Sequence, residues 1–297
     1  MSISDTAAPQ ALGQKTFTAQ DQIDFARSSR DWNPMHVDAV AARRLLSGRQ
    51  VVHGVHTLIH ALDLWQPQGQ QAIARLSCSF ANPANVGDTV TFSQRHDGSQ
   101  CLIAASVDGL TGTEVTIDTS PEAVASLPAT FGAGRPVRTI GELSAPLDEA
   151  AGSQLGSVIE LAAWRDDLAA RFPRAAQRLG QPALTALAQL SYFVGMVCPG
   201  LHSVSSSIVM TPGEASASTL RFEVRRYDPR FRLFIVAWCS AFGDFGRVMF
   251  FFFAIAISSV LAAPWSVTMR SANWRTSALL ACFCASCDSC TSASPPS

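Results

Sequence analysis

Two short stretches near the N-terminus hold side chains that can exchange protons. The first, DWNPMHVD, places Asp31 and His36 on either side of an Asn33-Pro34 turn. A carboxylate and an imidazole differ by about 2–3 units in unperturbed pKa, so their surroundings can give them different proton states near neutral pH. The second stretch, VVHG, ends at Gly54. The first stretch is compatible with an ordinary turn and helix cap, but the two together favour an acid–base pair that activates water.

The turn explains how the two side chains can meet. Proline disfavours a helical conformation in the residue before it, so a helix must end before Asn33-Pro34. The tight loop that results can direct Asp31 and His36 into one small volume, and the Asn33 amide can fix the loop. Asp38 is interpreted as the N-cap of a short helix, AVAARRLL, that ends at Gly48, and not as a participant in the chemistry.

The surrounding pattern predicts one helix followed by a meander of strands. Thr18 and Asp21 form the signature of a capping box that opens an earlier helix. Apolar residues at helical spacing then predict a central helix that starts near Gly54 and ends near Trp65 and Pro67. Alternating stretches after it predict four antiparallel strands, in RLSCSF, TVTFSQRH, CLIAASV and TEVTID. A helix followed by an antiparallel meander indicates an α+β architecture, with the sheet wrapped around the helix.

The second half repeats this order loosely. An apolar helix is expected over 184–197, followed by strands in LHSVSSSIVM, STLRFEVRRY and FRLFIVAWCS, which suggests an internal duplication. Nothing in residues 151–200 copies DWNPMHVD. The expected organisation is a disordered N-terminus (1–16), a catalytic domain (17–120), a Pro-rich linker (121–150), a degenerate second repeat (151–257) and an aberrant or disordered tail (258–297).

These residues resemble the MaoC-like dehydratases, which include the (R)-specific enoyl-CoA hydratases of the hotdog fold. The resemblance rests on Asp31, Asn33, Pro34, His36 and Asp38, then Gly48 and Val52-His53-Gly54, and on the stretch FANPANVGDTVTF. It is clear over residues 17–118, fainter over 183–236 and absent beyond about 238. It implies a double hotdog in which the second repeat has lost its catalytic residues.

The resemblance also implies a reaction. It is the reversible hydration of a trans-2-enoyl thioester to an (R)-3-hydroxyacyl thioester, with Asp31 and His36 holding the water. It assigns a backbone N–H at Gly54 to the thioester carbonyl oxygen, and the free N–H groups at a helix start suit that role. Asn33, Pro34 and His53 are expected to shape the site.

No metal or other cofactor is expected, because the family uses none and carries its substrate on CoA or on acyl-carrier protein. Asp31, His36 and His53 are also compatible with a facial carboxylate–histidine metal set, which is the weaker interpretation. Four cysteines near the C-terminus, Cys282, Cys284, Cys287 and Cys290, are spaced too tightly for the usual zinc pairs.

The C-terminal region contains an uncharged stretch, 248–269, between Arg247 and Arg270. Its length and hydropathy suit a membrane span, but a fully buried strand that completes the second repeat is favoured. The Cys- and Ser-rich sequence after it departs from the family and would be explained by a frameshift. Expression of residues 1–237 beside the full-length chain would show whether the C-terminal tail helps or harms the protein.

Composition bounds the remaining possibilities. The chain has 297 residues, 47% apolar and 15% charged, and a net charge of −1, so it can bury a large core and offers no electrostatic case for nucleic acid. The N-terminus has no signal-peptide pattern, so a cytoplasmic enzyme is expected, with association through 248–269 as the alternative. A pseudo-dimer within the chain is expected, and a homodimer is possible. For the function, the alternatives to an enoyl-CoA hydratase are a dehydratase that acts on acyl-carrier-protein thioesters and a non-catalytic acyl-binding protein tethered to a membrane.

Overall fold

The computed structural model describes residues 8–45, 47–69, 72–121, 136–148, 151–152, 158–162, 164, 166–211, 219–228, 233–240 and 250–253. The helices are α1 (Ala19–Ser29), α2 (Pro34–Val37), α3 (Ala39–Ala42), α4 (Gly54–Leu64), α6 (Leu168–Arg171), α7 (Pro173–Leu179) and α8 (Gln181–Tyr192), and α8 continues into the π-helix η1 (Phe193–Val197). The strands of the first half are β1 (Gln10–Thr16), β2 (Ala72–Phe80), β3 (Thr89–Asp97), β4 (Gln100–Val107) and β5 (Leu110–Ser120). Those of the second half are β6 (Val137–Ile140), β7 (Val158–Ala162), β8 (Ser205–Met210), β9 (Thr219–Asp228), β10 (Leu233–Ser240) and β11 (Phe250–Phe253).

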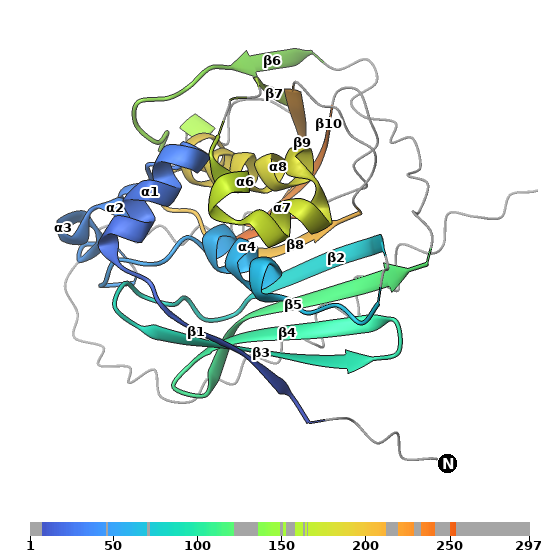
Figure 1. The fold of residues 1–297 in the computed structure, drawn as a ribbon. Coiled ribbons are helices and arrows are strands. Elements are labelled where there is room, and N and C mark those ends of the chain that lie inside the picture. The colour runs from blue at the N-terminus through green and yellow to red at the C-terminus, as the bar shows by residue number, and fades with distance from the viewer. Residues whose placement is uncertain are drawn as a thin grey trace, which may run out of the picture. The chain divides into compact units, whose positions relative to one another are not determined.

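All these strands belong to one sheet, in the order β1-β3-β4-β5-β2-β8-β11-β10-β9-β7-β6. The order β1-β3-β4-β5-β2 on one side mirrors β7-β9-β10-β11-β8 on the other, with β2 and β8 paired antiparallel at the centre. Each half has a helix, α4 or α8, immediately before its central strand. This correspondence supports the expected pair of hotdog repeats, and α4 lies against the sheet of the first half in Figure 1.

The core of the first half forms where the sequence pattern placed it. Leu58, Ile59 and Leu62 of α4 are at most 1% exposed, and they belong to the same cluster as the inward-facing Ile103 of β4 and Ile117 of β5. Outward-facing neighbours on these strands are partly exposed, as expected for a half-buried antiparallel sheet. The predicted central helix and the four antiparallel strands are confirmed. Only β3, β4 and β5 form a meander, however, because β2 pairs with β5 and not with β3, so the expected hairpin of β2 with β3 is wrong.

The capping box at the start of α1 is also present. Thr18 Oγ1 accepts a hydrogen bond from the Asp21 N–H at 3.1 Å, and the Asp21 carboxylate accepts one from the Thr18 N–H at 2.7 Å. We expect Thr18→Ala to lower the free energy of unfolding by about 1 kcal/mol, because two backbone groups at the helix start lose this reciprocal arrangement. Urea denaturation monitored by circular dichroism tests this, with Thr18→Ser as the control that keeps the cap. Equal unfolding midpoints for the alanine and serine variants would show that the cap adds no stability.

Two expected boundaries need correction, and one expectation about the C-terminal region is met in part. The prediction of a disordered N-terminus is wrong for Gln10–Thr16, which pair antiparallel with β3. The predicted linker 121–150 contains β6, which pairs parallel with β7, whereas 122–135 lie outside the described residues. Within the apolar stretch 248–269, Phe250–Phe253 form β11, which pairs with β10 in the antiparallel arrangement expected for a final hairpin. The rest of that stretch and the predicted tail 258–297 lie outside the described residues.

No helix in the described part of the chain is long and apolar enough to cross a bilayer.

Candidate active site

The loop between α1 and α3 brings Asp31 and His36 together at the start of α4. Asn33 caps α2 by accepting a hydrogen bond from the Met35 N–H at 3.2 Å, with Pro34 as the first helical residue. One turn of helix therefore separates the two side chains. A ring nitrogen of His36 and a carboxylate oxygen of Asp31 lie within 4.8 Å of each other, a gap that one water molecule can bridge with hydrogen bonds of about 2.8 Å to each group.

Asp31 is buried deeply, with 1% of its surface exposed. Its carboxylate accepts hydrogen bonds from the Ser191 hydroxyl at 2.7 Å and from the Asn33 N–H at 3.2 Å. Burial raises the pKa of Asp31, whereas the nearby His36 and these two hydrogen bonds act in the opposite direction. The carboxylate is thus held by donors but remains a stronger base than an exposed aspartate.

His36 is fixed through its other ring nitrogen. Its Nδ1 lies 2.9 Å from the Val51 carbonyl oxygen, which can only accept, so Nδ1 carries a proton and Nε2 of the neutral ring is left as an acceptor. Burial lowers the pKa of His36, and Asp31 partly offsets this. The pKa values of the two groups therefore move toward each other, which suits a pair that exchanges a proton with one water near neutral pH.

The ring of His53 stacks on the ring of His36 and is not exposed to solvent. Its ring lies 3.9 Å from that of His36, centroid to centroid, and it is fully buried. Its Nδ1 faces Gln22 Oε1 at 2.9 Å and its Nε2 faces the Asp31 carbonyl oxygen at 3.1 Å. Burial, followed by the charge on His36, lowers the pKa of His53 well below its usual range, so the neutral ring donates to one of these oxygens at a time. His53 packs against the site and ties it to α1.

Gly54 is the first residue of α4, next to His53, as the expected carbonyl-binding role requires. A Cβ at this position would lie 3.1 Å from the Phe80 ring of β2. Glycine therefore has a packing reason to be at this position. The oxyanion role of Gly54 stays a prediction.

Asp38 is an N-cap and stands apart from the chemistry. Its exposed carboxylate accepts hydrogen bonds from the N–H groups of Val40 and Ala41 at 2.8 and 3.0 Å. These bonds lower the pKa of Asp38. The cap interpretation is confirmed, although the helix that it starts is shorter than expected and ends at Ala42.

Three contributors to the site were not expected from the sequence: Gln22 in α1, Ser191 in α8 and Gly195 in η1. Gln22 orients His53, and Ser191 donates to Asp31. Gly195 lies so close to the Asp31 carboxylate that a Cβ there would collide with it. The last two lie 160 or more positions away from Asp31 in the chain, and no local pattern marks them.

A metal ion could be held only by the same three side chains, among the residues that the structure describes. Ligand atoms of Asp31, His36 and His53 lie within 4.8 Å of one another. Each of these side chains is already engaged with a protein group, namely Ser191, Val51 or Gln22. The arrangement fits a hydrogen-bonded acid–base pair better than an open metal site.

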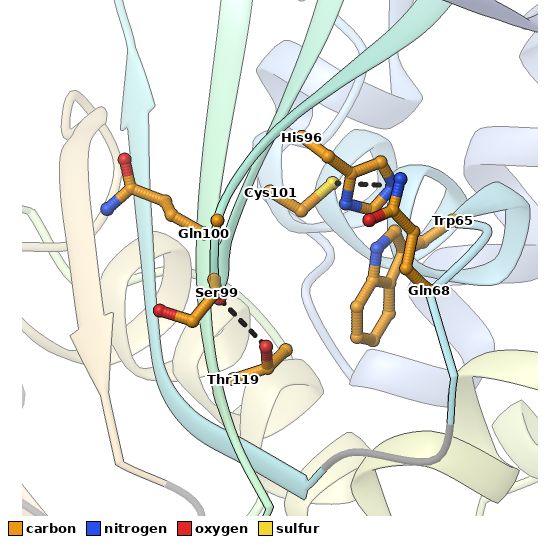
Figure 2. Close-up of a pocket in the computed structure, with 8 residues that line it drawn as sticks. Trp65, Gln68, His96, Ser99, Gln100, Cys101 and Thr119 are labelled. Atoms are coloured by element: carbon orange, nitrogen blue, oxygen red, sulfur yellow. Dashed lines mark hydrogen bonds between the residues drawn. The ribbon is translucent and has the colours of Figure 1, made fainter.

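Two cavities lie beside the site rather than within it. The larger, of about 410 Å³, is lined by Thr57 of α4, by apolar residues such as Val90 and Ala105, and by polar residues that include Asp88 and Asp108. The smaller, of about 130 Å³, lies near the opposite end of α4, beside Trp65, His96 and Cys101 (Figure 2). Neither is lined by Asp31 or His36.

Comparison with known proteins shows what this chain is similar to. Residues 6–118 match the model of the MaoC like domain. A solved MaoC-like dehydratase matches 84% of this chain and 98% of its own, at 14% identity and a TM-score of 0.51. An (R)-hydratase from A. caviae involved in PHA biosynthesis matches 40% of this chain and 97% of its own, at 23% identity and a TM-score of 0.34.

An R-hydratase from Pseudomonas aeruginosa matches 42% of this chain and 90% of its own, at 20% identity and a TM-score of 0.33. No curated protein matches the sequence. The likeness to the first of these structures shows a shared hotdog fold across both halves. The stretch that matches the MaoC like domain, residues 6–118, contains both Asp31 and His36.

Proposed function

We propose that the protein is a hydro-lyase that adds water reversibly to trans-2-enoyl thioesters, giving (R)-3-hydroxyacyl thioesters. The observation that carries the proposal is the close pair of the buried Asp31 and the half-buried His36, with His36 Nδ1 donating to the Val51 carbonyl. That contact leaves Nε2 as an acceptor beside a carboxylate that is itself an acceptor. Two acceptors at this spacing suit one water molecule that must be aimed and then deprotonated.

In the proposed mechanism the water between Asp31 and His36 attacks C3 of the enoyl thioester. One member of the dyad takes the proton from the water as the C–O bond forms. Negative charge moves to the thioester oxygen, where a backbone N–H at Gly54 stabilises it. The Asp31–His36 pair then returns the proton to C2, which completes the addition of water and regenerates the pair. No redox step is involved, so the proposed mechanism needs no cofactor.

The larger cavity supplies a place for the acyl chain in this proposal. Thr57, which lines it, lies one turn along α4 from Gly54, and the Ala84 carbonyl in its wall accepts a hydrogen bond from the Val52 N–H at 2.9 Å. The cavity therefore begins close to the expected thioester carbonyl. Val90, Ala105 and Val107 give part of its wall an apolar surface that suits a hydrocarbon chain, and the rest of the wall includes the polar Asn85, Asp88 and Asp108.

The carrier of the thioester is proposed to be CoA, with acyl-carrier protein as the alternative. The exposed Arg43 and Arg44 follow α3, directly after the catalytic loop. Both CoA phosphates and an acidic carrier protein would be attracted to these guanidinium groups. Turnover of crotonyl-CoA compared with crotonyl-acyl-carrier protein decides between the two carriers.

The experiment that tests the function is crotonyl-CoA hydration followed as loss of the conjugated absorbance, with His36→Asn as the diagnostic variant. Asparagine can still donate to the Val51 carbonyl but lacks the Nε2 acceptor, so we expect kcat to fall by about 10²–10⁴-fold. His202→Asn removes an exposed histidine and is the matched control, expected to behave as wild type. Equal turnover of the wild type and His36→Asn would show that His36 is not part of the chemistry.

A further inference from the structure

The carboxylate of Asp31, which belongs to the first repeat, is held from the second repeat. Ser191 near the end of α8 donates its hydroxyl proton to Asp31 Oδ2 at 2.7 Å, and both side chains are buried. Gly195 lies one helical turn after Ser191 and faces the same carboxylate. Two positions of one helical segment thus contact one catalytic group.

The same segment also fixes the loop that carries the dyad. The Asn33 side-chain amide donates to the Gly195 carbonyl at 3.0 Å and to the Leu201 carbonyl at 3.1 Å. The backbone at Gly195 is part of η1, whose closing bond runs from the Cys198 N–H to the Phe193 carbonyl at 2.7 Å. Short π-helical turns are uncommon and occur frequently at functional sites.

The Ser191 hydrogen bond has a chemical consequence that packing alone would not have. A hydroxyl that donates to a buried carboxylate stabilises its ionised form, which burial disfavours. It also occupies Oδ2, so the lone pairs that remain on the carboxylate are those available to a water molecule. The second repeat has no copy of DWNPMHVD, and this contact gives it a part in the site all the same.

We propose that Ser191 is a positioning residue, which orients the Asp31 carboxylate and stabilises its charge, so that the degenerate second repeat completes the active site of the first. This inference rests on the proposed function, because it assigns Asp31 the role of proton acceptor. Gly195 allows the close approach of α8 and η1 that the Ser191 contact requires.

Three other titratable groups face Asp31 and must be considered in any pH profile. They are His36 from α2, His53 from the start of α4 and Tyr192 from α8. Removal of the Ser191 hydroxyl leaves all three in place. A change in the acid limb of the profile in a Ser191 variant therefore reports on the coupled titration of Asp31 and His36, of which Asp31 is the group that the Ser191 hydroxyl contacts.

The test is the pH dependence of kcat for crotonyl-CoA hydration by the full chain, in the wild type and in Ser191→Ala. We expect kcat near neutral pH to fall about tenfold, with little change in KM. The acid limb should move up by about one pH unit, because the free energy of a hydrogen bond to a charged group corresponds to a pKa shift of about that size. Ser191→Thr keeps the hydroxyl and is expected to restore the wild-type profile. Ser203→Ala removes another buried hydroxyl, which donates to the Val194 carbonyl at 2.7 Å, and is the matched control.

The outcomes distinguish a failure of the role of Ser191 from a failure of the proposed function. Ser191→Cys keeps the side-chain size with a weak donor, so it carries the test if the alanine variant does not fold, and its profile should lie between the two extremes. A wild type that turns over beside alanine and cysteine variants with unchanged kcat and acid limb overturns the role of Ser191 alone. A folded wild type without turnover overturns the proposed function, and the inference with it.

Discussion

Asp31→Asn is expected to lower kcat for enoyl-CoA hydration by about 10³-fold while leaving the fold intact. The amide cannot accept a proton from water as the carboxylate does. It can still occupy the same place, because its oxygen can accept from the Asn33 N–H while its NH₂ donates to the Ser191 hydroxyl, which accepts as readily as it donates.

The stability of this variant is as informative as its activity. In the proposed mechanism Asp31 carries a charge in a buried position, at a desolvation cost that asparagine does not bear. Thermal unfolding should therefore occur at the same temperature as in the wild type, or higher. Asp38→Asn is the matched control, because asparagine also caps helices well and Asp38 stands in solvent. Loss of activity in both variants, or in neither, would contradict the assignment of Asp31.

Gly195→Ala is expected to disable the site from the second repeat. The added methyl group would collide with the Asp31 carboxylate, in a region where Ser191 and Asn33 leave no room for movement. A catalytic group displaced by about 1 Å loses about 10²-fold in rate. Overpacking of a buried contact also costs about 1–3 kcal/mol of stability.

A matched control for this variant exists in the same half of the molecule. Gly141 has nothing within 4 Å of the place where its Cβ would lie, so Gly141→Ala should leave kcat and the unfolding midpoint unchanged. Steady-state kinetics and urea denaturation of the two alanine variants give the comparison. If Gly195→Ala retains full activity, α8 and η1 do not set the position of Asp31.

The sequence predicts the first half well because its signals are local. The Thr18 capping box, the apolar face of α4 and the alternation in strands β2 to β5 each depend on residues within one element. The dyad loop is equally local, since Asn33-Pro34 determines where one helix ends and the next begins. These features appear in the structure at the expected residues.

What the sequence does not predict depends on contacts between distant segments. β1 has few apolar residues and a mostly exposed surface, and its strand conformation comes from pairing with β3. Ser191 lies on a helix that the pattern predicts, but nothing in an apolar helix indicates which position meets a carboxylate of the other repeat. The contact that the second repeat makes with Asp31 can therefore be recognised only in the folded structure, where the two halves lie together.

The hydration of a trans-2-enoyl-CoA by the purified full-length chain, with the product resolved by chiral chromatography, tests the central claim most directly. The account predicts water-dependent loss of the conjugated absorbance and accumulation of the (R)-3-hydroxyacyl-CoA, both absent in Asp31→Asn. A folded wild-type chain that leaves the enoyl-CoA unchanged, or that gives the (S) product, would contradict it.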